Sequence, residues 1–496
     1  MTARRVTPLR AAELKDAATR LLAAGGRMQM AYAWYPEPQR LELRYTASPA
    51  SGGPFAIWRC DASEPIPSLA TVSPLLSWYE REITDLFGLS FTDHPQPHHL
   101  VLHEGATAAV PPFAPDYPPD RPLLVKRTQQ AVPQVAGAED DVQLLPFGPV
   151  RADVVESGEF MFFYVGEAII HYHPRLFFKH RGMEKRFEGI EPSRGVVLAE
   201  RVSGVGSVAH ALAYCQAVES ASNCIVPPRA KFLRVLLAEL ERLYNHLHYF
   251  GHLCHTTTLK VGEAEGKLLE EQAKQLNTRL TGSRFLRSVL ALGGLRRDLS
   301  PDNWLESELA TLRARFSRYA EHMENTASHL DRLITTGKLD RRLAFDQGAT
   351  GPIERASGID RDLRRDHPYA AYAEIAPAVA VREAGDAHAR AQVRIAEVDA
   401  SIALIERALD LLPDGPVHAE CNVIPDSEGL GFTESPRGTL FYAVHIGGDG
   451  RLARVKIKSP SFSNWRVFPF TVHDTNMMDY GINEASFGLT IAGCDR

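Results

Sequence analysis

The sequence predicts an α+β protein with two domains: a small N-terminal α+β domain, then a large helix-bundle domain with small flanking β-sheets. A chain of 496 residues is too long for one ordinary hydrophobic core. A proline-rich stretch without helical or strand periodicity separates two parts of the chain that differ in residue pattern. Apolar residues spaced by three and four dominate the second part. We therefore expect a first domain over residues 1–104, a linker over residues 105–143 and a second domain over residues 144–496.

Short alternating strands and two helices make up the predicted first domain. Apolar residues at helical spacing predict the helices, and Gly88 ends the second of them. Alternation of apolar and polar residues predicts the strands. The expected elements are helices over residues 11–24 and 75–87, and strands over residues 28–34, 41–45 and 55–60.

Long helices dominate the predicted second domain. The clearest one begins at Pro227 and Pro228, because proline suits the first turn of a helix. Apolar side chains then repeat at three and four as far as Leu247. Further helices are predicted over residues 263–281, 304–335 and 379–412, and strands over residues 150–156, 160–166, 441–446 and 451–457.

The composition excludes several classes of function. A net charge of −6 provides no basic surplus, so no nucleic-acid partner is expected. No apolar run reaches the roughly 18–20 residues of a membrane-spanning helix, and no signal core follows the basic N-terminus, so we expect a cytoplasmic protein. The six cysteines are scattered, which predicts free thiols used mainly in packing. None of them is spaced as a CxxC metal-ligand pair.

Three polar clusters are candidates for chemistry, and each has a structural alternative. Residues 179–186 (KHRGMEKR) are the most densely charged, and a solvated surface is the alternative. The glycine-rich residues 200–207 open a predicted helix and could cradle a phosphate, although the P-loop lysine and the dinucleotide-binding spacing are both absent. Asn245, His246 and His248 share a helix, and a hydrogen-bonded core histidine is favoured there over a metal ligand.

An ordered series of motifs resembles a known family. Residues 180–185 (HRGMEK) resemble a hallmark shared by the forty-nine-kilodalton subunit of respiratory complex I and the large subunit of group 4 nickel–iron hydrogenases. Residues 78–82 (WYERE) and 85–88 (DLFG) are similar to the thirty-kilodalton subunit of complex I. Fusion of the two modules is typical of the formate hydrogenlyase type. The further matches are AYCQAVE at 213–219, VPPRA at 226–230, RVLLAEL at 234–240, TGP at 350–352, RASG at 355–358, DLR at 362–364 and ESPRG at 434–438.

The resemblance implies nickel and iron held by four cysteines in two CxxC pairs, and this chain departs from that pattern. Ser203 and Gly206 stand at the cysteine positions of the family motif RxCGxC. Near the end of the sequence Cys494 stands without a partner. Thiolates bind soft metals, whereas serine is a poor substitute and glycine has no side chain. We therefore expect no metal and no cofactor bound by this chain.

The resemblance also implies positions for proton transfer and for quinone. Complex I subunits carry a tyrosine and a histidine at the quinone head group, and these positions fall at Gly204 and near Glu156. Group 4 hydrogenases have a proton-transferring glutamate at about the position of Glu156, which makes Glu156 our candidate for that role. His180 is expected to help position the cluster-bearing partner, and Arg355 to line the former metal cavity.

The implied function is that of a large subunit in a membrane-associated, energy-converting oxidoreductase complex. Its expected partners are an iron–sulfur small subunit similar to the twenty-kilodalton subunit of complex I, a ferredoxin-like subunit and antiporter-like membrane subunits. These partners would hold the chain at the inner face of the cell membrane, and their iron–sulfur clusters would deliver electrons in a reaction coupled to ion translocation. Two alternatives stay open: a quinone-reducing NADH dehydrogenase-type subunit, with NAD bound elsewhere, and a non-catalytic scaffold.

Overall fold

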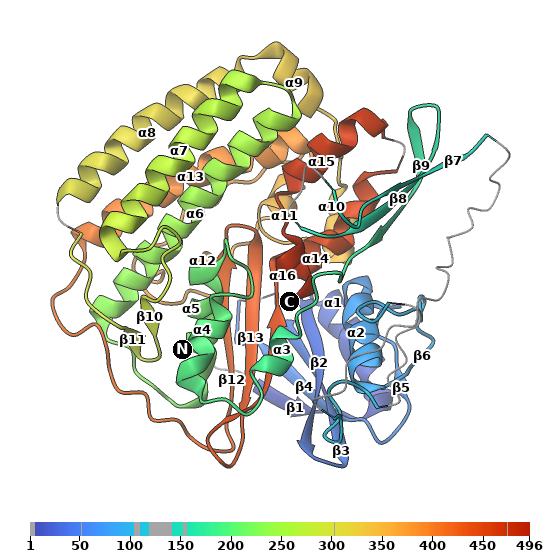
Figure 1. Ribbon diagram of the computed structural model, residues 1–496. Coiled ribbons are helices and arrows are strands. Elements are labelled where there is room, and N and C mark those ends of the chain that lie inside the picture. Colours follow the sequence, from blue (N-terminus) through green and yellow to red (C-terminus); the bar gives the residue numbers. More distant parts are fainter. Residues whose placement is uncertain are drawn as a thin grey trace.

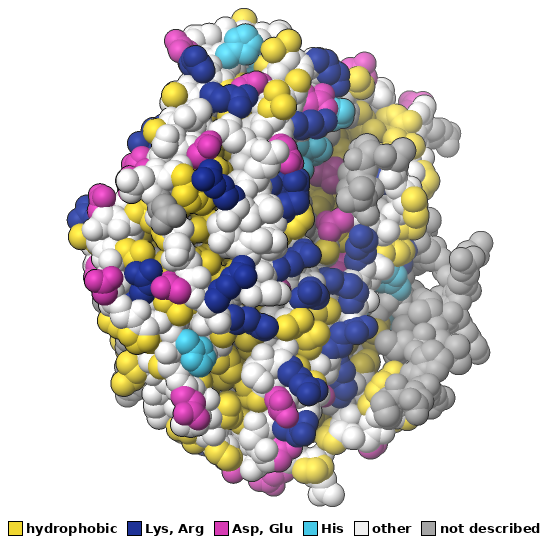
Figure 2. All heavy atoms as spheres, turned by 60° about the vertical axis from the view of Figure 1, so that its left-hand side comes forward, with side chains coloured by type: hydrophobic (Ala, Val, Ile, Leu, Met, Phe, Trp, Pro, Cys, Tyr) yellow, Lys and Arg dark blue, Asp and Glu magenta, His cyan; other side chains and the backbone are white. Residues whose placement is uncertain are grey.

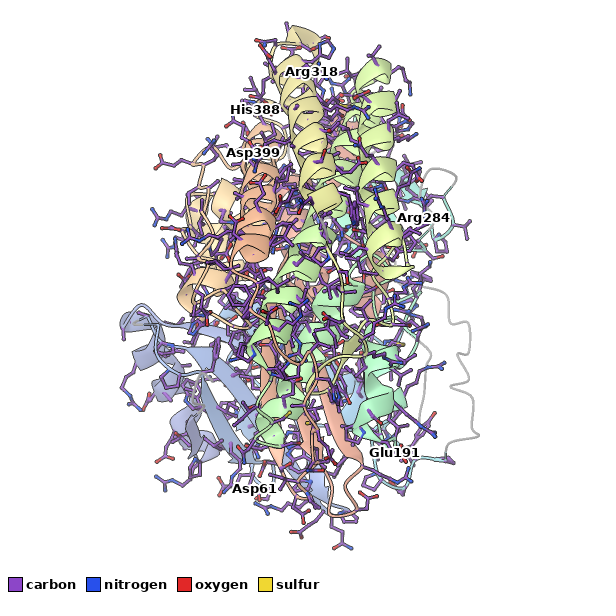
Figure 3. All side chains as sticks on the ribbon, turned by 90° about the vertical axis from the view of Figure 1, so that its left-hand side faces the viewer. Asp61, Glu191, Arg284, Arg318, His388 and Asp399 are labelled. Carbon is purple, nitrogen blue, oxygen red and sulfur yellow. The ribbon has the colours of Figure 1, made fainter. Side chains whose placement is uncertain are left out.

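Helices and strands combine in two domains that pack side by side, as the computed structural model shows (Figure 1). The N-terminal domain lies at one end of the molecule with Asp61, and the helix bundle reaches the other end with Arg318 and His388 (Figure 3). The α+β class predicted from the sequence is confirmed. The structure describes residues 5–50, 52–103, 110–118, 141–151, 156–301, 303–473 and 475–496.

A four-stranded sheet with two helices forms the N-terminal domain. The strand order is β1-β4-β3-β2, in which β3 is antiparallel to both neighbours and β1 is parallel to β4. The predicted helices and strands are confirmed, and β1 is an additional edge strand. The elements are β1 (Arg5–Pro8), η1 (Ala11–Glu13), α1 (Leu14–Ala23), β2 (Arg27–Glu37), β3 (Arg40–Ser48), β4 (Ala56–Asp61), β5 (Ile66–Pro67), η2 (Pro74–Leu76), α2 (Ser77–Phe87) and β6 (Phe91–Thr92).

Part of the predicted linker fills the joint between the domains. The ring of Phe113 is buried and stacks on Phe87 of α2 with 5.0 Å between centroids. The guanidinium of Arg454, from the second domain, lies 4.4 Å from the centroid of the Phe113 ring. This segment therefore packs against both domains. The rest of the predicted linker, apart from residues 110–118 and 141–143, lies outside the described residues.

Long helices α6, α7, α8 and α13 stand together as a bundle (Figure 1). Helices α6 and α7 cross closely at Gly251 and Gly266, because a Cβ on Gly266 would lie only 2.6 Å from the Gly251 Cα. The helices of this domain are α3 (Met183–Arg186), α4 (Pro192–Ala199), α5 (Ser207–Ala221), α6 (Pro228–Thr256), α7 (Lys260–Thr281), α8 (Asn303–Glu324), α9 (Ala327–Leu333), α10 (Arg341–Gln347), α11 (Pro352–Ala356), α12 (Leu363–Asp366), α13 (Ala387–Asp410), α14 (Pro460–Val467), η3 (Phe468–Thr471), η4 (Met477–Asp479), α15 (Tyr480–Phe487) and α16 (Ile491–Asp495).

Two predicted helices are shorter than expected. The helix predicted over residues 304–335 is broken after Glu324 into α8 and α9. The helix predicted over residues 379–412 begins only at Ala387. Asp386 caps it by accepting a hydrogen bond from the backbone N–H of Ala389 at 2.8 Å, which sets the start of the helix.

Two antiparallel three-stranded sheets flank the bundle, with the orders β12-β13-β14 and β7-β8-β9. Helix α5 packs directly on β12, since a Cβ on Gly431 would lie 2.0 Å from the carbonyl oxygen of Ala213. Of the strand predicted over residues 150–156, residues 152–155 lie outside the described part, and β7 precedes β8 instead. The strands are β7 (Gln143–Phe147), β8 (Glu159–Val165), β9 (Ala168–Arg175), β10 (Leu290–Ala291), β11 (Gly294–Leu295), β12 (Glu428–Ser435), β13 (Gly438–Ile446) and β14 (Leu452–Lys458).

The two domains share one hydrophobic core and several buried polar contacts. The ring of Trp34 stacks on His445 with 4.0 Å between centroids, and the hydroxyl of Tyr32 lies 3.0 Å from His445 Nε2. Arg27 forms a buried ion pair with Glu354 at 2.9 Å. These contacts hold the N-terminal domain against the second domain in a defined position.

Candidate functional site

The turn before α5 and the short helix α16 face each other. Ser203, which is 5% exposed, lies in this turn. A Cβ built on Gly493 would lie 3.6 Å from the Ser203 Oγ and 2.5 Å from the Thr490 Oγ1, and a Cβ on Gly206 would lie 3.9 Å from the Ser203 Cβ. We call Ser203, Gly206, Thr490 and Gly493 the hydroxyl–glycine cluster.

Thr490 and Gly493 form the second pair of positions in this cluster. Gly493, and not the neighbouring Cys494, faces Ser203. Thr490 and Gly493 are three residues apart, which is the spacing of Ser203 and Gly206 and of a CxxC pair. The thiol of Cys494 is fully buried, and burial raises its pKa well above the usual range. The contact between Gly493 and Ser203, and not the presence of a cysteine, therefore points to Thr490 and Gly493 as the counterpart of Ser203 and Gly206.

The polar side-chain atoms of the hydroxyl–glycine cluster are the hydroxyl oxygens of Ser203 and Thr490. Thr490 Oγ1 accepts a hydrogen bond from the backbone N–H of Gly493 at 3.2 Å and lies 3.2 Å from the Ser461 Oγ. A nickel–iron group bridged by thiolates needs sulfur ligands, and hydroxyls and glycines supply none. The residues of this cluster therefore do not fit such a group. Across the described ranges, no three His, Cys, Asp or Glu side chains are grouped as metal ligands.

Glu156 and Arg181 flank the cluster at the start of α16. The carboxylate of Glu156 accepts hydrogen bonds from the backbone N–H groups of Ile491 and Ala492, the second at 3.1 Å. The Arg181 guanidinium donates to the carbonyl oxygens of Val202 at 2.6 Å and Ala492 at 3.0 Å. The structure thus brings the predicted proton-transfer residue and the predicted charged motif together at one place.

His180 and Asp495 lie directly beside this group. His180 Nδ1 is 2.7 Å from the backbone carbonyl oxygen of Asp495, so the neutral ring carries its proton on Nδ1 and donates it. Burial lowers the pKa of His180. Burial also raises the pKa of the Asp495 carboxyl to about 7, although the backbone N–H of Lys179 donates to it at 2.9 Å. Asp495, which was not predicted from the sequence, can therefore hold a proton near neutral pH.

A buried histidine and tyrosine form a second pair next to the cluster. His210 Nδ1 lies 2.8 Å from the Tyr442 hydroxyl, and a Cβ on Gly206 would lie 3.3 Å from the His210 ring. Burial lowers the pKa of His210 to about 3, so its ring is neutral. His210 lies in the first turn of α5, just after Gly206, so its place near the cluster could have been predicted from the sequence. The pairing of His210 with Tyr442 on β13 could not have been predicted, because the two residues lie far apart in the sequence.

Arg355 belongs to a buried ion network of its own. Its side chain is 1% exposed and donates to Glu397 at 2.6 Å and to Glu434 at 3.1 Å, with Asp362 at 3.6 Å. This ion network joins α11, α13 and β12. Among the described residues, no polar contact links Arg355 to Glu156 or His180, so the structure does not bring the three predicted residues into one site.

The charged motif of residues 180–185 is only partly a solvated surface. Lys185 is exposed, but Glu184 is buried among Arg454 at 2.7 Å, Lys456 at 3.0 Å and Arg496 at 3.0 Å. Burial alone would raise the pKa of Glu184, yet these three cations outweigh it and hold the pKa well below its ordinary value. Glu82 of the N-terminal domain completes the group by pairing with Lys456 and Arg496. The motif therefore connects α16 with both domains.

Basic side chains gather on the surface. Figure 2 shows a band of Lys and Arg side chains along one face of the molecule. Next to the hydroxyl–glycine cluster, Arg181, Lys185, Arg186 and Arg201 are exposed. A positive surface of this kind attracts an acidic partner over a distance set by ionic strength.

Three family models match the chain. The 30 kDa subunit of respiratory-chain NADH dehydrogenase matches residues 9–122, and the 49 kDa subunit matches residues 269–426 and 420–496. Nickel-dependent hydrogenase matches residues 181–284. The fold and the site thus define a large subunit of the oxidoreductase complexes that include complex I and the nickel-dependent hydrogenases.

The chain belongs to the family in which the 30 kDa-like and 49 kDa-like domains of complex I are fused in a hydrogenase-type large subunit. Formate hydrogenlyase subunit 5 of Escherichia coli is 32% identical to it over 84% of this chain and 75% of the relative. The fused C/D component of NADH-quinone oxidoreductase from Cereibacter sphaeroides is 27% identical over 87% of this chain and 82% of the relative. The resemblance read from the motifs is confirmed.

A solved structure shares this fold. A chain of an archaeal respiratory membrane complex, the membrane-bound sulfane sulfur reductase, aligns with a TM-score of 0.68 and 26% identity. The match covers 72% of this chain and 99% of that chain. Within the ranges that the structure describes, no helix has both the length and the hydropathy needed to cross a bilayer.

Proposed function

We propose that this chain is the large subunit of a membrane-associated, energy-converting oxidoreductase complex that works without a nickel–iron centre of its own. The hydroxyl–glycine cluster supports this proposal, because Ser203, Gly206, Thr490 and Gly493 have the spacing of two ligand pairs but carry no sulfur. Iron–sulfur clusters of an acidic small subunit deliver the electrons, and the exposed basic residues beside His180 dock that subunit. A ferredoxin-like subunit and antiporter-like membrane subunits make up the rest of the complex at the inner face of the membrane.

In this proposal Glu156 transfers protons at the cluster. Its carboxylate lies at the first turn of α16, and Asp495 on the same short helix can hold a proton near neutral pH. His180 fixes the end of α16 through its bond to the Asp495 carbonyl. Arg355 acts at a distance, by holding α11, α13 and β12 together behind the site.

A second candidate function is quinone reduction, and the His210–Tyr442 pair supports it. These two side chains lie next to Gly206, and together they supply the kind of hydrogen-bond donors that a carbonyl head group needs. The relative named as a component of NADH-quinone oxidoreductase agrees with this alternative. Reduction of a soluble quinone by the purified complex, lost in Tyr442→Phe but retained with other acceptors, would favour it.

Metal analysis of the purified complex tests the central proposal. We expect iron in the amount that the partner clusters require and nickel far below one atom per chain, because the cluster offers no thiolate. Inductively coupled plasma mass spectrometry on anaerobically purified complex measures both metals. One nickel atom per chain would overturn the proposal, and a complex without electron transfer to any acceptor would favour the non-catalytic scaffold.

Glu156→Gln tests the proton-transfer role. Proton-coupled turnover of the assembled complex is expected to fall about 100-fold or more, because the amide cannot exchange a proton. Glu159→Gln is the matched control: its carboxylate pairs with Arg175 on β9 instead of the cluster. Turnover of Glu156→Gln equal to that of the control, in a complex of normal composition, would rule the role out.

A further inference from the structure

A cavity of about 380 Å³ lies between the two domains, and none of the hydroxyl–glycine cluster lines it. The N-terminal domain contributes Arg27 and residues 48–50 to its wall, and the second domain contributes Arg361, His367 and Thr439. Its volume is in the range of small-molecule sites, which occur preferentially at domain interfaces. The proposed electron-transfer function does not use this cavity.

The acidic side chains in the cavity wall already have cationic partners. The four carboxylates pair with three arginines that the fold itself provides, since Asp360 and Asp366 share Arg365. The pairs are Glu354 with Arg27 at 2.9 Å, Asp362 with Arg364 at 2.7 Å, Asp360 with Arg365 at 2.7 Å and Asp366 with Arg365 at 2.8 Å.

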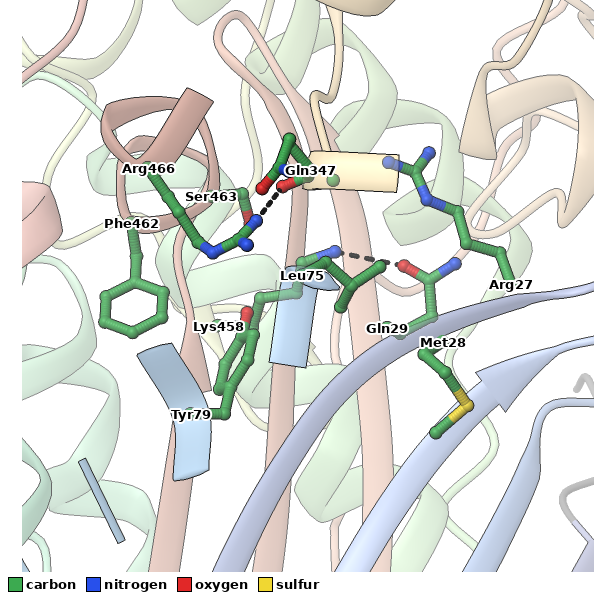
Figure 4. Close-up of a pocket in the computed structure, with 11 residues that line it drawn as sticks. Arg27, Met28, Gln29, Leu75, Tyr79, Gln347, Lys458, Phe462, Ser463 and Arg466 are labelled. Carbon is green, nitrogen blue, oxygen red and sulfur yellow. Dashed lines mark hydrogen bonds between the residues drawn. The ribbon is translucent and has the colours of Figure 1, made fainter. Parts of the chain in front are cut away.

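Two basic side chains of the same region, Arg361 and Lys458, have no carboxylate partner among the described residues. Arg361 is half-buried in the wall, and among the described residues no carboxylate pairs with its guanidinium. Behind the wall, Lys458 donates to two neutral oxygens. These are the side-chain oxygen of Gln29 at 3.0 Å, which Figure 4 shows, and the hydroxyl of Thr439 at 2.9 Å. Burial lowers the pKa of Lys458, and the charges of Arg27 and Arg361 lower it further. Among the described residues, Arg361 is therefore the arginine of the cavity wall that has no carboxylate partner.

His367 adds an unsatisfied polar atom. Its side chain is 5% exposed, its ring stacks on Phe55 with 4.3 Å between centroids, and its Nδ1 has no hydrogen-bond partner among the described residues. Buried polar atoms are nearly always bonded, so an orphan in a cavity wall indicates a missing partner.

We propose that this cavity binds a small oxyanion, a phosphate or carboxylate group, on Arg361 and Arg27, with His367 and Thr439 as further hydrogen-bonding groups. A guanidinium matches such a group with two parallel hydrogen bonds. The anion gives the Arg361 guanidinium an anionic partner and gives the orphaned His367 nitrogen a hydrogen-bond partner. Because both domains line the cavity, the bound anion links them.

Isothermal titration of the purified complex with inorganic phosphate and, separately, with succinate tests the proposal. One saturable site per chain is expected for at least one of the two probes, and the probe that binds identifies the phosphate or the carboxylate source. Arg361→Gln should weaken binding at least tenfold. Arg318→Gln should leave it unchanged, because Arg318 is exposed on α8 near the far end of the bundle (Figure 3).

The Tm of Arg361→Gln without ligand separates binding from a structural role. Among the described residues the side chain has no carboxylate partner, and the hydrogen bond from Arg355 to residue 361 uses the backbone carbonyl, which the substitution keeps. We therefore expect an unchanged or higher Tm. A large fall in Tm, equal binding by wild type and Arg361→Gln, or no saturable binding of either probe by wild type would each overturn the proposal.

Discussion

Arg355→Met is expected to lower the free energy of unfolding by about 3–5 kcal/mol, because it leaves buried carboxylates without their cation. The Arg355 guanidinium is the shared partner of Glu397 and Glu434, and all three side chains are almost fully buried. Burial, together with the charge of Asp362, raises the pKa of Glu434 to about 7, so Glu434 can become neutral by binding a proton. In the wild type, Arg355 and His246 hold the pKa of Glu397 well below the usual range, against the effect of burial. In Arg355→Met, Glu397 loses Arg355, its main partner.

Urea unfolding of the purified complex tests this prediction, because a loss of stability lowers the urea concentration at the midpoint of the transition. Arg318→Met is the matched control: it removes an exposed arginine from α8 and should change the free energy of unfolding by less than about 0.5 kcal/mol. Equal midpoints for the two variants would mean that the network contributes little to stability. A direct role of Arg355 in turnover would then be the better explanation of its presence.

Glu184→Gln is expected to cost a similar amount at neutral pH, about 3–5 kcal/mol, because Glu184 is a shared partner of Arg454, Lys456 and Arg496. These cations hold the pKa of Glu184 below its ordinary value, so the stabilisation is complete above the unfolded-state pKa of about 4.3. It is lost as the pH falls below that value toward the folded-state pKa. The difference between wild type and variant should therefore stay constant from neutral pH down to the unfolded-state pKa and shrink in stronger acid.

Urea midpoints measured at a series of pH values test this dependence. Glu188→Gln is the control, since Glu188 pairs with the exposed Lys185 and such pairs contribute about 0–1 kcal/mol. A difference that persists unchanged into acid would show that Glu184 stabilises the protein through something other than its charge. A Glu184→Gln variant as stable as the control would remove the proposed connection between α16 and the two domains.

Local patterns predict much of this fold because they depend on neighbours in the chain. The proline at the start of α6 and its apolar spacing predict that helix. The same kind of spacing does not reveal the cap at Asp386, so the predicted helix starts at residue 379 instead of Ala387. The motif read from residues 201–206 places Ser203 and Gly206 at a site, yet it cannot say what lies opposite.

The sequence by itself determined the family, the α+β class, the long helices and the absence of a cysteine pair at Ser203 and Gly206. Only the tertiary structure decided that Gly493 and not Cys494 faces Ser203, and that Glu184 points into the protein. Only it placed Arg355 in a network apart from Glu156. The physical reason is distance along the chain: the Glu184–Arg496 bond joins residues 312 positions apart, and the Arg355–Glu434 bond joins residues 79 apart. Helical periodicity is a local property, whereas the partner that a buried charge finds depends on how the whole chain packs.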